Sequence, residues 1–141
     1  MRYLGLDLGT RTLGISISDK TNTIASVYKT IRFEEKEYEA LFEPLKKIID
    51  EEKISKLVLG LPKNMNNSLG FRAEETMLFK EKLEKKLNIE VVLQDERLTT
   101  VEANNYLLKS DMSRKKRKQK IDSLAANIIL QTYLDKEKGK L

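Results

Sequence analysis

The sequence contains no cysteine and no histidine. Disulfides, zinc sites built from thiolate or imidazole, and catalysis by Cys–His or Ser–His pairs are therefore excluded. Any acid–base or metal chemistry must come from carboxylates, lysine, tyrosine or a bound ion. A chain without cysteine also fits a reducing compartment, so we expect a cytoplasmic protein.

Long apolar runs are missing as well. No run approaches the roughly 18 residues that a membrane span needs. The N-terminal stretch, MRYLGLDLG, reaches Asp7 before the apolar core of a signal peptide could form. We therefore expect neither export nor a membrane partner.

The remaining composition is that of a folded domain rich in charge. Of the 141 residues, 40% are hydrophobic and 35% are charged, and 27 Lys and Arg against 22 Asp and Glu give a formal net charge of +5. Apolar positions recur at regular spacing among the charged ones, which argues against global disorder. A chain of this length fits one domain, so we expect a single domain over residues 1–141.

The first part of the chain alternates apolar and small or polar residues with the period of a β-strand. This pattern predicts three strands, over Tyr3–Leu8, Thr12–Ser18 and Ile24–Phe33. Because only short turns separate them, the three strands should pair as an antiparallel meander.

The period then changes to that of a helix. Apolar residues from Tyr38 to Ile49 follow helical spacing, and Pro44 should kink or restart that helix. The later pattern predicts strands over Lys56–Gly60 and Ile89–Gln94, and helices over Leu69–Leu87, Thr100–Lys109 and Asp122–Lys136. Strand–helix–strand order requires parallel pairing through right-handed crossovers. The expected fold class is α/β, with a mixed five-stranded sheet, three antiparallel strands followed by two parallel ones, flanked by helices.

Asp7 is the first residue that could carry chemistry. It lies on the strand face opposite the leucines of Tyr3–Leu8, between Gly5 and Gly9. A carboxylate in mid-strand is costly to desolvate unless it is paired or binds a cation. The glycines should leave space for a ligand, although a hydrogen bond to the following turn would also explain the aspartate.

Two further acids follow later in the chain. Glu96 comes after the last predicted strand, continues the face of Gln94, and falls where ligands gather in parallel sheets; a surface salt bridge with Arg97 is the alternative. Asp122 opens the last predicted helix, where capping is the commonest role of aspartate. The small residues Ala125 and Ala126 would let that end of the helix approach the sheet.

Taken together, the three acids suggest a metal site. They come from well-separated parts of the chain and could converge over one sheet. Clustered carboxylates repel one another and suit a hard divalent cation, so Mg²⁺ or Mn²⁺, as two ions, is the expected cofactor. In a chain without histidine this is a natural design for a two-metal phosphodiester site.

A basic run precedes Asp122. Six of the seven residues from Arg114 to Lys120 are basic. Charges so close repel one another, so we expect a mobile segment that orders on a polyanion. A merely solvated loop is the alternative.

Four blocks of the sequence resemble the bacterial YqgF/RuvX family. They are LGLDLGTRTLGISISD, VLGLPKNMNNSLGFRAE, DERLTT and SRKKRKQKIDSLAANIILQTYLD, they occur in the family's order, and they span nearly the whole chain. This group is described as pre-16S rRNA nucleases and, earlier, as Holliday junction resolvases. The resemblance implies a ribonuclease H-like fold, with Asp7, Glu96 and Asp122 as the acidic site.

The leading hypothesis is a metal-dependent nuclease acting on structured RNA, the 16S rRNA precursor or a pre-ribosomal particle, as a monomer or weak homodimer. Metals held by the three acids would activate a water and stabilise the leaving 3′-oxygen. Phosphates would be held by Thr10, Arg11, Lys63, Arg72, Arg97, Arg114, Lys115, Lys116, Arg117 and Lys118.

The sequence is compatible with three alternatives. A resolvase of four-way DNA junctions would keep the chemistry but usually needs two sites in a symmetric dimer. Asp-Leu-Gly-Thr also resembles the phosphate loop of sugar kinases, actin and chaperone ATPases, but those proteins use two such domains. A non-catalytic RNA-binding assembly factor would bind tightly and cleave nothing.

Overall fold

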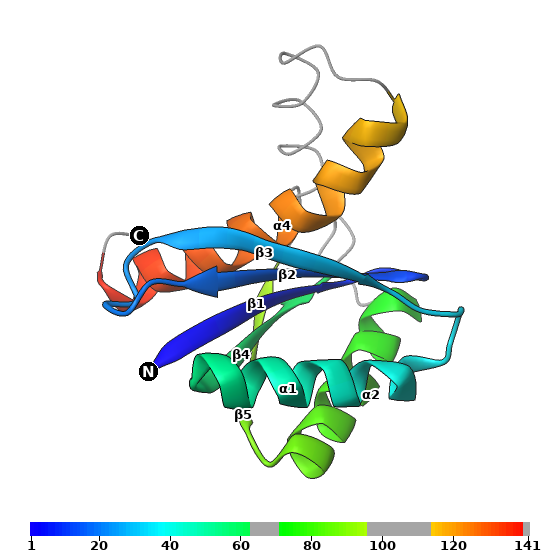
Figure 1. Cartoon of the computed structure of the whole chain (residues 1–141), viewed down its shortest axis with the longest axis horizontal. Coiled ribbons are helices and arrows are strands. Elements are labelled where there is room, and N and C mark those ends of the chain that lie inside the picture. Colours follow the sequence, from blue (N-terminus) through cyan, green and yellow to red (C-terminus); the bar gives the residue numbers. More distant parts are fainter. Residues whose placement is uncertain (63–70, 96–113, 140–141) are drawn as a thin grey trace.

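The computed structural model describes residues 1–62, 71–95 and 114–139, and its centre is a five-stranded sheet in the order β3-β2-β1-β4-β5 (Figure 1). Its strands are β1 (Arg2–Leu8), β2 (Thr12–Ser18), β3 (Ala25–Arg32), β4 (Ile54–Leu61) and β5 (Glu90–Asp95). The first three pair antiparallel, while β4 pairs parallel to both β1 and β5. The predicted mixed sheet is confirmed.

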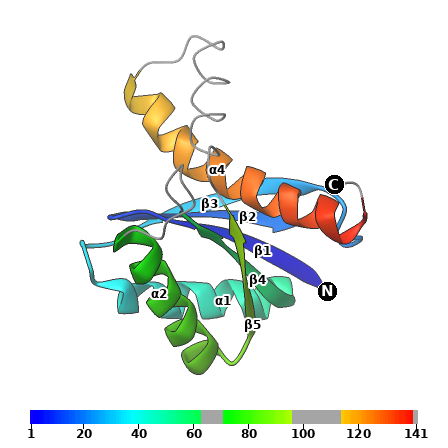
Figure 2. The ribbon, with the colours of Figure 1, turned by 180° about the vertical axis from the view of Figure 1, so that it is seen from behind.

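Helices cover both faces of the sheet. Both views show α4 (Arg114–Glu137) on one face and α1 (Phe42–Glu52) and α2 (Phe71–Leu87) on the other (Figures 1 and 2). The strand period explains this division, because alternate residues point to opposite faces. Leu4, Leu6 and Leu8 of β1 join the core under α1 and α2, whereas Val58 of β4 packs with Leu130 of α4.

α4 approaches the sheet closely at Gly5. A Cβ built on Gly5 would lie 2.6 Å from Leu130 Cβ and 2.8 Å from the Ala126 carbonyl oxygen. Ser16 Oγ donates a hydrogen bond of 2.8 Å to that same carbonyl. The expectation that Ala125 and Ala126 permit a close approach is confirmed, since both are buried. The expectation that Gly5 leaves space for a ligand is wrong, because α4 fills it.

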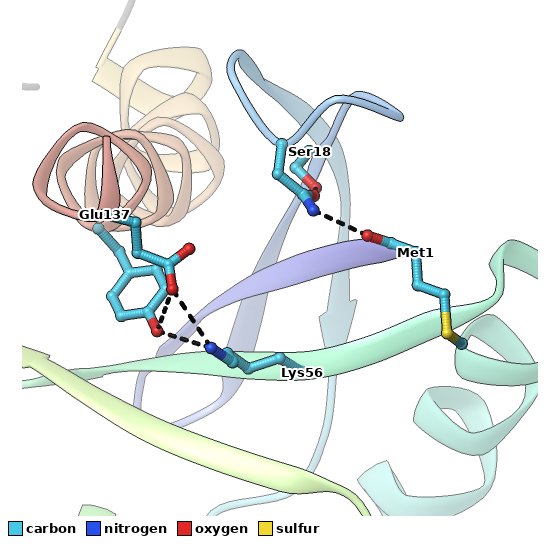
Figure 3. Close-up of polar contacts among 6 residues, drawn as sticks. Met1, Ser18, Lys56 and Glu137 are labelled. Atoms are coloured by element: carbon cyan, nitrogen blue, oxygen red, sulfur yellow. Dashed lines mark hydrogen bonds and ion pairs between the residues drawn. The ribbon is translucent and has the colours of Figure 1, made fainter. Parts of the chain in front are cut away.

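The other end of α4 is tied to the sheet by a lysine. Lys56 Nζ donates to the Tyr133 hydroxyl at 2.9 Å and lies 3.4 Å from Glu137 Oε2 (Figure 3). It also lies 4.8 Å from the centre of the Tyr3 ring. Burial lowers the pKa of Lys56, but the bond to Tyr133 and the nearby Glu137 carboxylate outweigh it, so the pKa is raised. Lys56 therefore stays charged and holds the last turns of α4 against β4.

The start of α1 shows how Pro44 is accommodated. A 3-10 turn, η1 (Tyr38–Leu41), leads directly into α1, which begins at Phe42. Pro44 therefore lies in the first helical turn, where a backbone N–H has no partner within the helix. The predicted restart of the helix is confirmed.

The start of α4 differs from the prediction. The helix begins at Arg114, not at Asp122, so the basic run is helical. Lysine, arginine and glutamine are good helix formers, and their propensity here outweighs the charge repulsion that favoured a mobile segment or loop. The predicted helix over Thr100–Lys109 lies outside the described residues. In the part of the chain that is described, no helix has the length and apolarity for a bilayer crossing.

Candidate active site

Asp7 lies near the end of β1, on the side of the sheet that α4 covers. It is half-buried, and Gly5, two residues earlier on the same strand face, contacts α4 directly. Leu6 and Leu8 point the other way, into the core under α1 and α2. The strand face predicted for Asp7 is therefore confirmed.

The parallel strands place a second polar group in line with Asp7. Leu6 pairs with Leu59 of β4, and Gly60 pairs with Gln94 of β5. Extending the pairing of β1 with β4 by one residue brings Asp7 opposite Gly60. Asp7, Gly60 and Gln94 therefore form one row across the three strands, on the face that α4 covers. Two strand spacings separate β1 from β5, or about 10 Å.

Glu96 directly follows the last residue of β5 but lies outside the described residues. Its predicted face can be followed as far as Gln94, which is buried. Val92, on that same face, packs against the core beneath α4. Asp95 is the last residue of β5 and pairs with Leu61, the last residue of β4. β5 therefore stops at the same end of the sheet as β1.

Asp122 lies inside α4, roughly two turns after the helix begins. The N-cap interpretation is therefore wrong. The helix runs antiparallel to β1, because the Tyr133 ring contacts that of Tyr3 at 6.2 Å and Ala126 lies over Gly5. Position 122 is one turn before Ala126 on the same side of the helix, and hence further toward the Asp7 end of the strand.

These observations place two of the predicted acids without testing the triad. Among the side chains that the structure describes, no three Asp, Glu, His or Cys residues gather in a way that could hold a metal. These side chains include that of Asp7 but neither that of Glu96 nor that of Asp122. The metal site therefore stays a prediction, with Asp7 in β1 and position 122 in α4 approaching the same end of the sheet.

Two predicted phosphate-binding residues form the turn between β1 and β2. Thr10 and Arg11 are both exposed there, and the Gly9 N–H closes the turn with a 2.8 Å bond to the Thr12 carbonyl. Arg11 is 3.8 Å from Glu35, but both side chains are more than half exposed, so this ion pair is weak. The arginine is thus accessible beside the end of β1.

Arg72, another predicted phosphate-binding residue, points at the protein backbone. Its Nη2 donates a 2.7 Å hydrogen bond to the Leu8 carbonyl, and its Nη1 lies 3.7 Å from Glu75 Oε1. The other oxygen of Glu75 accepts a bond from Tyr38. Burial, followed by this bond to Glu75, raises the pKa of Tyr38. Sequence reasoning missed Glu75 and Tyr38; the only local signal was the i, i+3 spacing of Arg72 and Glu75.

The remaining basic residues divide into two groups. Lys63 and Arg97 lie outside the described residues. The backbone of Arg114, Lys115, Lys116, Arg117 and Lys118 forms the first turns of α4. Both ribbon views show these turns projecting beyond the sheet (Figures 1 and 2).

Comparison with known proteins adds a family. A family model described as "RuvX: Holliday junction resolvase" matches residues 1–136. A protein of Thermoanaerobacter pseudethanolicus is 48% identical over 141 residues, covering 99% of this chain and 100% of the relative. One from Geobacillus sp. (strain WCH70) is 48% identical over 135 residues, covering 96% of this chain and 98% of the relative. Both relatives carry the name "Putative pre-16S rRNA nuclease".

Solved structures share the fold. Thermus thermophilus RuvC in complex with a Holliday junction substrate superimposes with a TM-score of 0.60 at 12% identity, covering 99% of this chain and 96% of that one. Fowlpox virus resolvase in complex with Holliday junction DNA gives 0.55 at 12% identity, covering 97% and 99%. The predicted ribonuclease H-like architecture is thereby confirmed.

Proposed function

The chain belongs to the RuvX family, and from this premise we propose that it is a metal-dependent nuclease that processes the 16S rRNA precursor. The observation that carries the proposal is near-half identity along almost the full length of relatives named as pre-16S rRNA nucleases. The position of Asp7 supports it, since this half-buried residue lies one position before the end of β1, where the parallel strands β4 and β5 also end. Residues 1–141 would act as one nuclease domain.

The donor chemistry fits a hard cation. Without histidine or cysteine the chain offers only oxygen ligands of the carboxylate and carbonyl type, which suit Mg²⁺ or Mn²⁺. Asp7, Glu96 and Asp122 would hold two such ions. When bound, the ions would supply an activated water and offset charge on the leaving 3′-oxygen.

The protein's own part in the reaction would be to hold the metal-binding carboxylates in position. Asp7 is fixed by a strand that pairs on both sides, with β2 and with β4, so its backbone has little freedom to shift. α4 closes over the same face, held at Gly5 and again at Lys56. Together these contacts would keep the carboxylates in place while the phosphodiester is attacked.

Substrate phosphates would meet cations on two sides of this site. Thr10 and Arg11 are exposed in the turn beside Asp7, and Lys63 and Arg97 would add to them. The basic turns of α4 would contact the backbone of structured RNA further away, without reading its sequence. A chain without cysteine fits the reducing cytoplasm. Its partner there would be precursor rRNA or a pre-ribosomal particle. The protein would bind this partner as a monomer or weak homodimer.

The decisive experiment offers labelled precursor 16S rRNA to the protein with Mg²⁺, with Mn²⁺ and with chelator. We expect cleavage only with metal, and none by Asp7→Asn prepared in parallel, which also controls for a contaminating nuclease. Tight binding without cleavage at every metal concentration would instead show a non-catalytic assembly factor.

A second candidate substrate is a four-way DNA junction, favoured by the description of the matching family model. Symmetric cleavage of a junction requires two active sites, and therefore a dimer. A labelled four-way junction included in the same experiment, with the oligomeric state measured by ultracentrifugation, separates the two. Junction cleavage by a stable dimer would favour the resolvase, and cleavage of rRNA alone by a monomer would exclude it.

A further inference from the structure

The backbone at the end of β1 has a carbonyl that the sheet cannot satisfy. The Gly9 N–H donates to the Thr12 carbonyl, toward β2. Because a trans peptide points its C=O opposite to its N–H, the Leu8 carbonyl points away from β2, toward β4. In a parallel ladder that carbonyl would accept from an N–H of β4.

β4 provides no N–H donor opposite the Leu8 carbonyl. Leu6 pairs with Leu59, so the register extended by two residues brings Leu8 opposite Leu61. The N–H that would reach the Leu8 carbonyl belongs to the next residue of the chain, Pro62, which has none. The parallel ladder therefore ends in an open acceptor, directly after Asp7.

Arg72 fills that position from α2. Its Nη2 donates to the Leu8 carbonyl at 2.7 Å, as a charged group replacing the missing backbone donor. Glu75 Oε1 lies 3.7 Å from Arg72 Nη1, and only 14% of the Glu75 side chain is exposed. The other carboxylate oxygen of Glu75 accepts a hydrogen bond from the Tyr38 hydroxyl. The Tyr38 ring packs at 5.6 Å from Phe33 and 5.8 Å from Phe79. The Arg72 guanidinium is therefore held in place by Glu75, which is itself held by Tyr38, and the Tyr38 ring packs in the core.

We propose that Arg72 is a positioning residue that fixes the end of β1, and with it the Asp7 carboxylate, and is not a phosphate ligand. The proposal rests on the proposed function, because it gives Asp7 a role in metal binding and catalysis. It replaces the phosphate role expected for Arg72 from the sequence. The two roles predict opposite kinetic results.

The test compares Arg72→Gln with Lys80→Gln. Lys80 is also a cation of α2 in an ion pair, with Glu84, so its substitution removes the same charge from the same helix. For Arg72→Gln we expect kcat to fall about 10- to 100-fold and Mn²⁺, titrated by calorimetry without substrate, to bind correspondingly more weakly. KM and the salt dependence of RNA binding should match those of Lys80→Gln. A phosphate ligand would instead raise KM and reduce the log–log salt slope by about 0.7–0.9, with kcat unchanged, and that result would overturn the proposal.

Glu75→Gln covers the case in which Arg72→Gln fails to fold. It keeps the cation but removes the carboxylate that holds it. A positioning role predicts lower kcat, whereas a phosphate-binding arginine released from its carboxylate would bind RNA as well or better. Equal kcat in Glu75→Gln and the parent overturns the proposal.

Amide hydrogen exchange gives a readout that needs neither metal nor substrate. The Gly9 amide should exchange faster in Arg72→Gln, because the end of β1 is released there. The Asn22 amide, which bonds to Asp19 in the turn between β2 and β3, should not change. If the parent neither cleaves nor binds Mn²⁺, the proposed function fails; unchanged exchange at Gly9 with an active parent refutes the positioning role alone.

Discussion

Replacing Gly5 with alanine should force α4 away from the sheet. The added Cβ would clash with Ser16 Oγ, and it would lie 2.6 Å from Leu130 Cβ and 2.8 Å from the Ala126 carbonyl oxygen. Carbon atoms pack at about 3.5–4.0 Å, so the helix must retreat by about 1 Å. Two of the three contacts are with atoms that cannot rotate away, because one belongs to the helix backbone and the other is a Cβ.

We expect Gly5→Ala to lower the free energy of unfolding by about 1–3 kcal/mol, the usual cost of overpacking a core. Urea titration followed by circular dichroism measures this difference. Cleavage should fall as well, since the same shift moves position 122 relative to Asp7, and a misplacement of about 1 Å can reduce a rate about 100-fold.

Gly9→Ala is the matched control. A Cβ there would lie 3.1 Å from both the carbonyl oxygen and the Oγ1 of Thr12, a contact that a small adjustment relieves. Its cost in stability should therefore be clearly smaller than that of Gly5→Ala. Equal stability of Gly5→Ala and the parent would refute the conclusion that α4 packs on β1 at this point.

Three further predictions concern the acids and the basic turns. Asp7→Asn and Asp122→Asn should each abolish cleavage without lowering the free energy of unfolding, because in the proposed site each would relieve repulsion among clustered acids; a clear loss of thermal stability in both would contradict that site. The Asp19 carboxylate accepts hydrogen bonds from the backbone N–H groups of Thr23 and Ile24, which lower its pKa to about 2. Its contribution to stability is therefore complete above about pH 4 and is lost as the pH falls toward 2. Asp19→Asn should reduce the dependence of urea unfolding on pH in that window. Glutamine at Lys115, Lys116, Arg117 and Lys118 should preserve the helix and flatten the salt dependence of RNA binding, and an unchanged slope would show that the run contacts no phosphate.

The sheet could be predicted from the sequence because its two faces differ in composition. β2 was predicted with its observed bounds, Thr12–Ser18, and β1 within one residue. Both strands place leucine and isoleucine toward the core under α1 and α2, and small or polar residues toward α4. Strict alternation of this kind fixes the strand face, and short turns fix the antiparallel partners.

The contacts of Arg72 could not be predicted in the same way. Arg72 and Leu8 are 64 positions apart, and their hydrogen bond exists because β4 ends in a particular register against β1. Pro62 is visible in the sequence, but which carbonyl it leaves open depends on that register. Lys56 and Tyr133, 77 positions apart, are a second example. Local patterns carry no information on pairings set by the ends of elements.

The helical start of α4 changes how the basic run could hold nucleic acid. In a mobile segment each cation would lose conformational freedom on meeting a phosphate, and binding would be weakened by that cost. As the first turns of a helix, the backbone of Arg114–Lys120 is already ordered and continuous with the segment that carries Asp122 and packs on β1. Six of the seven residues in this stretch are basic, so the helical segment concentrates positive charge that could attract phosphates. The same helix would then link RNA capture to the placement of position 122, and a displacement of α4, as in Gly5→Ala, should weaken both binding and cleavage, whereas loss of the basic side chains should weaken binding alone.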